Sequence, residues 1–454
     1  MMVKHFDVGV IGSGPAGLSA AHPLQAAGQA TVIIEEYLWG GTCPNYGCDP
    51  KKVLIAAVEA KERAEWLKND GLAGNTWLDW PKLMAHKMAY TDPVPARKIA
   101  ALDATGVTHV YGHGQFLDAH TVEVNGERIT ADTWIIATGA RPARLNVPGD
   151  EYLADNEAFL NLPAMPAEVA IIGTGFIAIE FANIAAAAGA KVQVIAHQHH
   201  ILREFDQDLT QTMIAQMERK GIRFNWDFET RAVEKNATGV TLVATDGRRI
   251  QTEMAFVATG RIGNVDQINL SVTGVELGDN GVKVDTNLAT NIKHIYAVGD
   301  VADTNVPKLT STGAYEARYV ANHILGTELA AIQYPAVPVI VFGSPKLGQV
   351  GVTPLQAQQL GYQIERFDMT NWLEYWRLKE PVAQAKVIFD ADGVIVGATI
   401  LSGSADEMLN YFTVAINQRQ TKADLKQNMY AYPSLGSDLG FYFSGSNLPQ
   451  NRQK

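Results

Sequence analysis

Short apolar runs that alternate with glycine-rich turns and helical segments dominate the first two thirds of the chain. An apolar run at Phe6–Ile11 is followed by a glycine-rich turn, a helical segment and a β-rich run at Thr31–Glu35. The same order recurs from Val169–Ile172 to Lys191–Ile195, with an alanine-rich helical stretch around Ile184–Ala188. A strand, a tight turn, a helix and a second strand make up the unit from which parallel sheets are built. The pattern therefore predicts two α/β units in one chain.

Both glycine-rich turns carry a dinucleotide-binding fingerprint. The first reads GSGPAG from Gly12 and the second GTGFIA from Gly173, each between a predicted strand and helix. The glycines permit a tight turn and close backbone approach, and the helix N-terminus faces a pyrophosphate. Glu35 ends the next strand of the first unit, where a carboxylate accepts hydrogen bonds from a ribose. An Ala-Thr-Gly sequence repeats near the end of each unit, which supports an internal duplication.

The second unit differs from the first where the ribose of its nucleotide is expected. Ala196 occupies the position that corresponds to Glu35, and the following loop contains His197 and Arg203. The absence of an acid at this position, together with nearby cationic groups, favours the binding of a ribose that carries a 2′-phosphate. His197 and Arg203 are therefore candidates for the phosphate of NADPH, which is favoured over NADH. The alternative for the histidine cluster is an exposed loop or an adventitious metal site.

Length and composition limit the classes of protein to consider. With 454 residues, the chain has room for about three domains, and 47% hydrophobic with 19% charged residues is typical of a globular protein. A formal net charge of −11 argues against nucleic acid as a partner. The sequence has no uninterrupted apolar run of about 18 residues, which argues against a membrane span. A strand follows the N-terminus almost at once, leaving no room for a signal peptide, so we expect a cytoplasmic protein.

The only two cysteines, Cys43 and Cys48, lie close together in the motif GGTCPNYGCDPKK. They can form one internal disulfide, and in a reducing cytosol such a bridge is usually catalytic or redox-sensing. Two buried thiols or half of a zinc site are the alternatives, although zinc lacks a second cysteine pair. Asp49 is a good N-cap and Pro50 a good first helical residue, so we expect a helix to start there. The helix N-terminus and Lys51 favour a thiolate at Cys48, whereas the charge of Asp49 opposes it.

Taken in order, these motifs resemble the class I flavoprotein pyridine nucleotide-disulfide oxidoreductases, the family of glutathione reductase, lipoamide dehydrogenase and mercuric reductase. The matching motifs are GxGxxG, GGTCxxxGCxPKK, ATG, a second GxGxxG, ATGR and the sequence from Tyr296 to Asp300. The resemblance covers nearly the whole chain. It implies FAD in the first unit, NADPH in the second, and an interface domain after about Tyr334.

The resemblance also implies roles for particular side chains. Cys48 would be the flavin-facing thiol and Cys43 the interchange thiol that attacks the substrate. Lys51 and Glu180 would form an ion pair beside the flavin. Phe176 would be an aromatic gate over the nicotinamide pocket. The predicted cofactor contacts are Gly12, Ser13, Gly14, Pro15, Ala16, Gly17, Glu35, Glu36, Gly41, Thr42, Lys51, Gly114, Ala137, Thr138, Gly139, Gly173, Gly175, Phe176, Ile177, Glu180, His197, Arg203, Gly260, Arg261, Gly299, Asp300, Leu309 and Thr310, with Arg261 as an additional NADPH contact.

The C-terminal region departs from the family pattern at its acid–base residues. Where relatives carry His-Pro-Thr-x-x-Glu, this chain has Tyr432-Pro433-Ser434-Leu435-Gly436-Ser437, and Asp438 comes one place late. A phenol of pKa about 10 is a poor base at neutral pH but can donate a proton or hydrogen bond, so Tyr432 is a candidate catalytic residue. His22 and Pro23 stand where glutathione-specific members carry arginines, which puts glutathione in doubt. A tolerated helix kink is the simpler interpretation of Pro23.

The predicted fold class is α/β, with FAD- and NAD(P)-binding Rossmann-like domains and a C-terminal α+β dimerisation domain. The predicted FAD domain covers 1–148 and 285–333, the NAD(P)H domain 149–284 and the interface domain 334–454. The aromatic segment Trp372–Trp376 is expected to pack the interface sheet, the alternative being a substrate cleft.

The leading hypothesis for function is a homodimeric, NADPH-dependent, FAD-containing enzyme, with its active site shared across the interface. It would reduce a small oxidised sulfur compound through Cys43 and Cys48, without a metal. One alternative acceptor is a hypohalous or hypothiocyanous oxidant, a metal ion or a quinone. A non-enzymatic flavin redox sensor is the alternative of another class.

Overall fold

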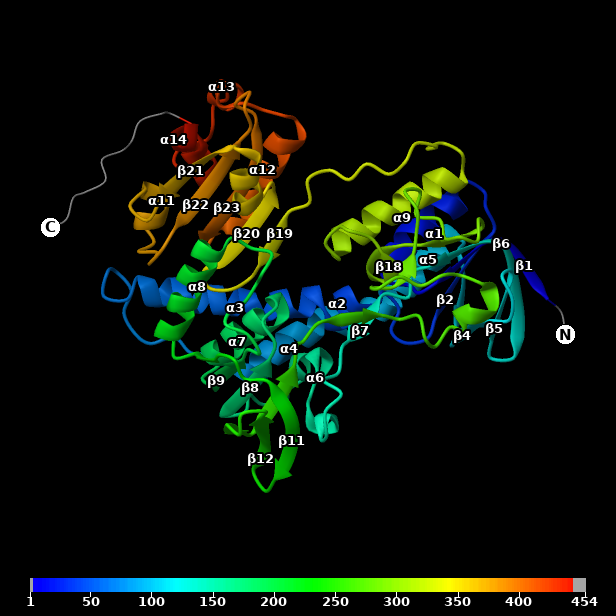
Figure 1. The fold of residues 1–454 in the computed structure, drawn as a ribbon, viewed down its shortest axis with the longest axis horizontal. Helices are drawn as coiled ribbons and strands as arrows, with labels where there is room; N and C mark the ends of the chain where they lie inside the picture. Colours follow the sequence, from blue (N-terminus) through cyan, green and yellow to red (C-terminus); the bar gives the residue numbers. More distant parts are fainter. Residues whose placement is uncertain (1–2, 444–454) are drawn as a thin grey trace.

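The structure, a computed structural model, describes residues 3–443. Three sheet-containing regions are joined by the long helix α3 and by extended connections (Figure 1). The first sheet lies near the N-terminal end of the long axis, and the C-terminal sheet lies at the other end. The second α/β unit projects from the middle of the molecule, on the side away from the C-terminal sheet.

The first sheet contains, side by side and parallel, the two strands predicted on either side of the first glycine-rich turn and its helix. β1 pairs in parallel with β2 on one side and with β6 on the other. β17 comes from much later in the chain and pairs with the end of β6. The strand order is β3-β2-β1-β6-β5-β4, with β17 beside β6. The strands are β1 (Lys4–Ile11), β2 (Thr31–Glu35), β3 (Thr108–Tyr111), β4 (Gly114–Phe116), β5 (Thr121–Val124), β6 (Glu127–Ile136) and β17 (Ile295–Ala297).

Helices α1 and α9 pack against each other beside this sheet. Pro23 lies inside α1 and the helix continues past it, as the kink interpretation expects. The elements of this region are the helices α1 (Pro15–Ala26), α5 (Val94–Thr105) and α9 (Thr310–Ile324), and the short strands β16 (Val282–Lys283) and β18 (Ala302–Asp303).

The second α/β unit has a fully parallel sheet in the order β10-β9-β8-β14. Residues 178–185 of α7 are all buried, which confirms the packed alanine-rich helix. A two-stranded link of β7 and β15 joins this unit to the first one. The elements are β8 (Glu168–Ile172), β9 (Lys191–Ile195), β10 (Arg223–Asn225), β14 (Met254–Val257), the antiparallel β11 (Thr230–Asn236), β12 (Gly239–Ala244) and β13 (Arg249–Thr252), the link strands β7 (Ala140–Pro142) and β15 (Arg261–Gly263), and helices α6 (Asn156–Leu160), α7 (Phe176–Ala187) and α8 (Gln207–Arg219).

The C-terminal region is built on an antiparallel sheet in the order β19-β20-β23-β22-β21. Tyr375 is buried, and the Trp372 ring packs on the rings of Phe367 and Tyr442, so these two side chains pack the domain as expected, whereas Leu373 and Trp376 are exposed. The elements are β19 (Val339–Val341), β20 (Lys346–Gly351), β21 (Gln363–Asp368), β22 (Gln384–Phe389), β23 (Ile395–Ser402), α10 (Pro354–Leu360), α11 (Leu373–Trp376), α12 (Ala405–Asn417), α13 (Lys422–Lys426) and α14 (Leu439–Phe443).

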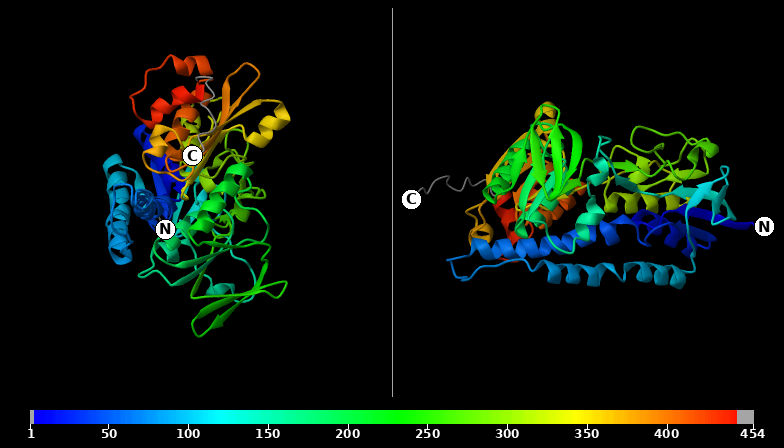
Figure 2. Two further views of the ribbon diagram at one scale, coloured as in Figure 1. Left: turned by 90° about the vertical axis from the view of Figure 1, so that its left-hand side faces the viewer. Right: turned by 90° about the horizontal axis from the view of Figure 1, so that it is seen from below.

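Helix α3 (Cys48–Trp66) connects these regions and starts at the cysteine motif. Leu54 and Val58 of α3 share one core with Phe181 of the second unit and Leu347 of the C-terminal sheet. Helix α4 (Trp80–Thr91) packs alongside α3, as the view from below shows (Figure 2). Burial in a shared core fixes α3, and therefore the cysteine motif, relative to both neighbouring units.

These sheets and helices confirm the mixed α/β architecture. The domain boundaries after residues 148, 284 and 333 stay predictions. Within residues 3–443, every helix is too short or too polar to cross a bilayer.

Candidate active site

The cysteine motif is pressed against the first glycine-rich turn. Gly40 and Gly41 have φ angles of 100° and 67°, in the left-handed region that favours glycine. A Cβ atom added to Gly41 would lie 2.6 Å from the Cα of Gly14. The short helix α2 (Thr42–Tyr46) follows and carries Cys43. The backbone approach of Gly41 to Gly14 thus sets the position of Cys43 relative to the first nucleotide turn.

The start of α3 corrects one prediction about Asp49. The helix begins at Cys48, with Gly47 as its N-cap and without a capping side chain. Asp49 lies in the first turn, and its carboxylate accepts hydrogen bonds from Cys43 and Tyr90 instead of capping the helix. The prediction of Asp49 as N-cap was wrong because side-chain partners outside the helix hold the carboxylate.

The two thiols lie in different electrostatic surroundings. A hydrogen bond from the Cys43 thiol, a hydrogen bond with Thr310 and the charges of Lys51 and Lys52 outweigh burial and lower the pKa of Cys48 to about 6. The hydrogen bond with Cys48 and burial raise the pKa of Cys43. The structure shows the two cysteines as free thiols, and Cys48 is open to the adjoining cavity. At neutral pH the dithiol therefore carries its negative charge on Cys48 and its proton on Cys43.

A buried carboxylate with two ammonium partners lies next to the cysteines. Glu180, on α7, is fully buried, with Oε2 2.6 Å from Lys51 Nζ and 3.0 Å from Lys52 Nζ. Its Oε1 accepts a hydrogen bond of 3.0 Å from the backbone N–H of Phe342. Burial opposes ionisation, but the charges of Lys51 and Lys52 win and lower the pKa of Glu180. The structure therefore brings Lys51 and Glu180 together and adds Lys52, which sequence reasoning missed although it is the next residue.

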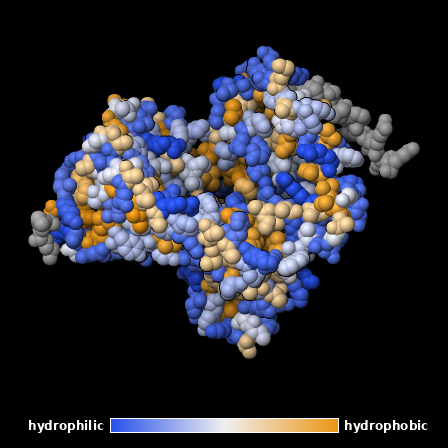
Figure 3. All heavy atoms as spheres, turned by 180° about the vertical axis from the view of Figure 1, so that it is seen from behind, coloured by the Kyte–Doolittle hydropathy of each residue, from blue (hydrophilic) through white to orange (hydrophobic). Residues whose placement is uncertain are grey.

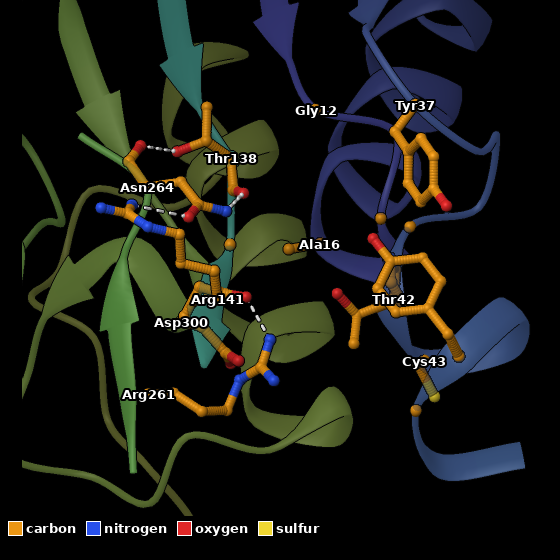
Figure 4. Close-up of a pocket in the computed structure, with 18 of the residues that line it drawn as sticks. Gly12, Ala16, Tyr37, Thr42, Cys43, Thr138, Arg141, Arg261, Asn264 and Asp300 are labelled. Carbon is orange, nitrogen blue, oxygen red and sulfur yellow. Dashed lines mark hydrogen bonds between the residues drawn. The ribbon is translucent and has the colours of Figure 1, made fainter. Parts of the chain in front are cut away.

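A cavity of about 420 Å³ opens in front of Cys48 and extends along the first sheet. Figure 4 shows Gly12 and Tyr37 on one side of it and Thr138, Asn264 and Asp300 on the other. The predicted residues that line it are Gly12, Gly14, Pro15, Ala16, Glu35, Glu36, Gly41, Thr42, Cys43, Cys48, Lys51, Gly114, Ala137, Thr138, Gly139, Phe176, Ile177, Arg261, Gly299, Asp300, Leu309 and Thr310.

Some predicted residues support the cavity from behind. Ser13 is buried and donates hydrogen bonds to Glu35 Oε2 from its N–H and its hydroxyl, at 2.9 and 2.8 Å. A Cβ atom on Gly17 would lie 1.9 Å from the carbonyl oxygen of Gly12, so Gly17 permits the close packing of turn and helix. Gly173, Gly175, Gly260, His197 and Arg203 belong to the second unit and do not themselves line the cavity.

The cavity fits the adenosine ribose and the pyrophosphate of FAD. A Cβ atom on Gly12 would lie 2.3 Å from the carbonyl oxygen of Ala137, so the turn leaves room only for backbone. Glu35 Oε1 accepts one hydrogen bond, from Tyr37 N–H at 2.9 Å, and keeps a lone pair for a ribose hydroxyl. Helix α1 starts directly after the turn and presents its N–H groups to a pyrophosphate.

Several lining residues lie outside the family motifs and were not predicted. Asn264 donates from its side chain to the Thr138 carbonyl at 2.9 Å, and Arg141 donates to the Asn264 side chain at 3.1 Å (Figure 4). Tyr37 donates to Glu157 at 2.5 Å. Arg261, expected as a contact to NADPH, lies in the wall of this cavity and donates to the carbonyl of Ala140. These contacts cross from one unit to the other, so local sequence carries no signal for them.

The second glycine-rich turn has an open approach. Gly173 has a φ angle of 135°, and Phe176 at the start of α7 is 41% exposed. Ala196 is buried, so the end of β9 presents no acid to a ribose. The N–H of Leu202 donates to the Thr174 carbonyl at 3.0 Å, which brings Arg203 beside the turn. Arg203 and His197 are exposed, and within the described part of the chain neither forms an ion pair.

The C-terminal residues offer no obvious acid–base pair. Tyr432 is 73% exposed and does not line the described cavity. The Ser437 hydroxyl donates to the Ser434 carbonyl at 2.6 Å, as part of a local cap. Asp438 is buried, and burial together with the charge of Glu374 raises its pKa to about 7. None of these groups contacts Cys43 of the same chain in the region that the structure describes.

Over residues 3–443, no group of three or more His, Cys, Asp or Glu side chains is arranged to hold a metal ion. His199 instead lies 3.9 Å from Asp227 and near the Trp226 ring.

Comparisons with known proteins define the class. Residues 6–317 match the pyridine nucleotide-disulphide oxidoreductase family, and residues 337–440 match its dimerisation domain. Dihydrolipoyl dehydrogenase from Bacillus subtilis is 31% identical over 95% of this chain and 94% of its own length. Glutathione reductase from Burkholderia cepacia is 31% identical over 97% of this chain and 98% of its own. The chain belongs to the pyridine nucleotide-disulphide oxidoreductase family.

A solved structure shares the fold over nearly the full length. The HOCl-induced flavoprotein disulfide reductase RclA from Escherichia coli superposes with a TM-score of 0.88, at 23% identity, over 96% of this chain and 99% of its own. Membership confirms a flavoprotein oxidoreductase that acts on sulfur groups, with FAD and NAD(P)H as cofactors, and a C-terminal dimerisation domain.

Proposed function

We propose that this enzyme uses NADPH to reduce a small oxidised sulfur compound through Cys43 and Cys48. The observation that carries the proposal is that both thiols line the cavity and that only Cys48 has a lowered pKa. Bound FAD would pass electrons from the nicotinamide to the Cys43–Cys48 disulfide. Cys48, held as a thiolate by its hydrogen bonds with Cys43 and Thr310 and by the charges of the nearby lysines, would face the flavin, and Cys43 would attack the substrate.

The residues around the thiols supply binding, orientation and charge. The glycine turns, Glu35 and Asp300 would hold the flavin nucleotide, and Phe176 would cover the nicotinamide site. Lys51 and Glu180 would set the charge beside the flavin ring. Two copies of the chain would pair through the dimerisation domain, and Tyr432 of each would approach the cysteines of its partner as a hydrogen-bond donor.

A second candidate keeps this machinery with a more reactive acceptor. The exposed Tyr432 and the capped Ser437 leave the tail without an imidazole–carboxylate pair. A hypohalous or hypothiocyanous oxidant, a metal ion or a quinone needs less acid catalysis than a dialkyl disulfide. The likeness to a protein described as HOCl-induced favours testing such oxidants. A non-enzymatic sensor is disfavoured, since the chain belongs to a family of enzymes.

The experiment that tests the function is NADPH oxidation by the purified FAD-loaded protein with a panel of acceptors. The panel contains small disulfides, glutathione disulfide, hypothiocyanite, a Cu²⁺ salt and a quinone. We expect small oxidised sulfur compounds to be turned over fastest and glutathione disulfide slowly, because His22 and Pro23 replace the arginines of glutathione-specific relatives. Faster turnover of the quinone or Cu²⁺, retained after Cys43→Ser, would contradict the proposal.

We expect Arg203→Ala to reduce the preference for NADPH over NADH. A charge-assisted contact to the 2′-phosphate contributes about 1.5–3 kcal/mol, which corresponds to about 10- to 150-fold in affinity. Stopped-flow reduction of the bound flavin by each nucleotide measures the effect. Arg219→Ala, which removes an exposed arginine from α8, is the matched control. Equal efficiency of NADPH and NADH with the unmodified enzyme would contradict the proposed preference for NADPH.

A further inference from the structure

Asp49 contacts the Cys43 thiol from outside the cofactor cavity. The Sγ of Cys43 lies within hydrogen-bond distance of Oδ1 of Asp49, at 3.7 Å, so the single Cys43 proton can be donated either to Cys48 or to Asp49. Cys43 lines the cavity, whereas Asp49 does not belong to the wall formed by the described residues. The carboxylate therefore meets the interchange thiol on a side that bound FAD leaves free.

A second side chain fixes the Asp49 carboxylate. The hydroxyl of Tyr90, on α4, donates to Oδ2 of Asp49 over 2.7 Å. Arg97 donates to the carbonyl oxygen of Tyr90 at 3.0 Å, and its guanidinium lies 5.6 Å from the centre of the Tyr90 ring. Tyr90 is 41% exposed, so the contact between Tyr90 and Asp49 lies at the surface of the described chain. A carboxylate with one oxygen on a nucleophile and the other on an orienting donor has the arrangement of an acid–base residue.

We propose that Asp49, oriented by Tyr90, is the acid–base residue of Cys43. In this scheme Asp49 transfers the proton that a histidine of the C-terminal tail transfers in relatives, and it does so within one chain. The inference rests on the proposed reduction of an oxidised sulfur compound. Asp49 touches a reacting atom and is a catalytic residue in this scheme. Tyr90 acts through Asp49 and is a positioning residue.

The step balances for a disulfide RS–SR′. The Cys43 thiol gives its proton to the Asp49 carboxylate as its sulfur attacks, the Cys43–SR bond forms and the S–SR′ bond breaks. The leaving R′S⁻ takes the proton from Asp49 and departs as R′SH. The Cys48 thiolate then attacks the sulfur of Cys43, RS⁻ leaves, and the Cys43–Cys48 disulfide forms. The dithiol loses two electrons, the substrate gains them, and Asp49 ends ionised as it began.

The charge distribution in the reduced site supports this scheme. The hydrogen bond with Cys48 and burial raise the pKa of Cys43, and the negative charge of Asp49 adds to that increase. Asp49 thus contributes to keeping the exchangeable proton on the thiol that attacks the substrate. The anion is left on Cys48, beside Lys51 and Lys52.

The first experiment compares two disulfides that differ in how much acid their leaving thiolate needs. Bis(2-hydroxyethyl) disulfide releases a basic thiolate, whereas 5,5′-dithiobis(2-nitrobenzoate) releases an acidic one that leaves unprotonated. We expect Asp49→Asn to slow the first about 100-fold or more and the second less than about 5-fold, because acid catalysis contributes about 10²–10⁴-fold where it is needed. Tyr90→Phe should show the same selectivity with a smaller loss, about 3- to 10-fold. Asp92→Asn, which removes an exposed charge at the end of α4, is the control.

The second experiment does not depend on any substrate. In Cys48→Ser holoenzyme, Cys43 is the only thiol, and its rate of alkylation by iodoacetamide reports its thiolate fraction. Adding Asp49→Asn should raise that rate about 5- to 10-fold at neutral pH, since removing a nearby negative charge lowers a thiol pKa. Adding Asp92→Asn should leave it within about twofold. A variant that only damaged the structure would not combine faster alkylation with slower turnover of the basic disulfide.

Three results would overturn the proposal. They are an equal loss of both disulfide activities in Asp49→Asn, unchanged alkylation of Cys43 in that variant, or a selective loss of the disulfide with the basic leaving thiolate in Tyr432→Phe but not in Asp49→Asn. If the unmodified enzyme reduces neither disulfide, the proposed function is wrong, and the alkylation result alone then decides whether Asp49 controls the Cys43 proton.

Discussion

Replacing Cys48 by serine is expected to lower turnover of oxidised sulfur compounds by about 10³-fold or more while leaving the cofactor sites intact. After Cys43 attacks the substrate, only a second thiolate can displace the bound half and regenerate the disulfide. A serine hydroxyl is a far weaker nucleophile at neutral pH. Cys43→Ser should be equally inactive, because it removes the attacking thiol, so activity alone does not separate the two roles.

Absorption spectra of the reduced holoenzyme separate them. A thiolate next to a flavin gives a long-wavelength charge-transfer band, which Cys48→Ser should lose and Cys43→Ser should keep. With a Cys48 pKa of about 6, the band in the unmodified enzyme should be present at neutral pH and fade as the pH drops through 6. The band fades toward low pH because Cys48 is a thiolate only above its pKa. The same band in both variants would contradict the assignment of roles.

Most of the wall of the cavity could be predicted because its determinants are local. A glycine whose Cβ atom would collide with backbone, as at Gly12 and Gly41, is constrained by the turn itself and leaves a sequence signature. The order of motifs along the chain then placed the cysteine pair beside the first turn. Contacts made by backbone groups at the ends of strands follow from the βαβ unit and need no further information.

The parts of the site that could not be predicted depend on contacts between residues far apart in the sequence. Lys52 becomes a partner of Glu180 only because α3 packs against α7. Asp49 reads as a helix cap in the sequence, and only the packing of α4 beside α3 shows that its carboxylate is shared by Tyr90 and Cys43. Asn264 reaches Thr138 across the junction of two units. Single-sequence periodicity carries no record of such pairings.

The buried carboxylate of Glu180 provides the largest expected effect on stability. We expect Glu180→Ala to lower the free energy of unfolding by about 3–5 kcal/mol, since it leaves the ammonium of buried Lys51 without its counterion. Glu180→Gln should cost less, because the amide oxygen can still accept the Phe342 N–H hydrogen bond. Urea unfolding of the FAD-loaded protein, followed by flavin release and tryptophan fluorescence, measures both.

Acid should have the same effect on this site as the substitution. The folded-state pKa of Glu180 is depressed, so its contribution to stability is present above the ordinary carboxyl range and is lost as the pH falls through the folded-state pKa. Glu62 provides a matched control. Its carboxylate lies 2.5 Å from Lys220 Nζ, in an ion pair that does not involve the cysteine motif. Glu62→Gln should leave the reduced spectrum unchanged, whereas Glu180→Gln should weaken the Cys48 band by changing the charge beside it. A Glu180→Gln spectrum identical to that of the unmodified enzyme would mean that the ion pair stabilises the fold and has no part in setting the charge at the flavin.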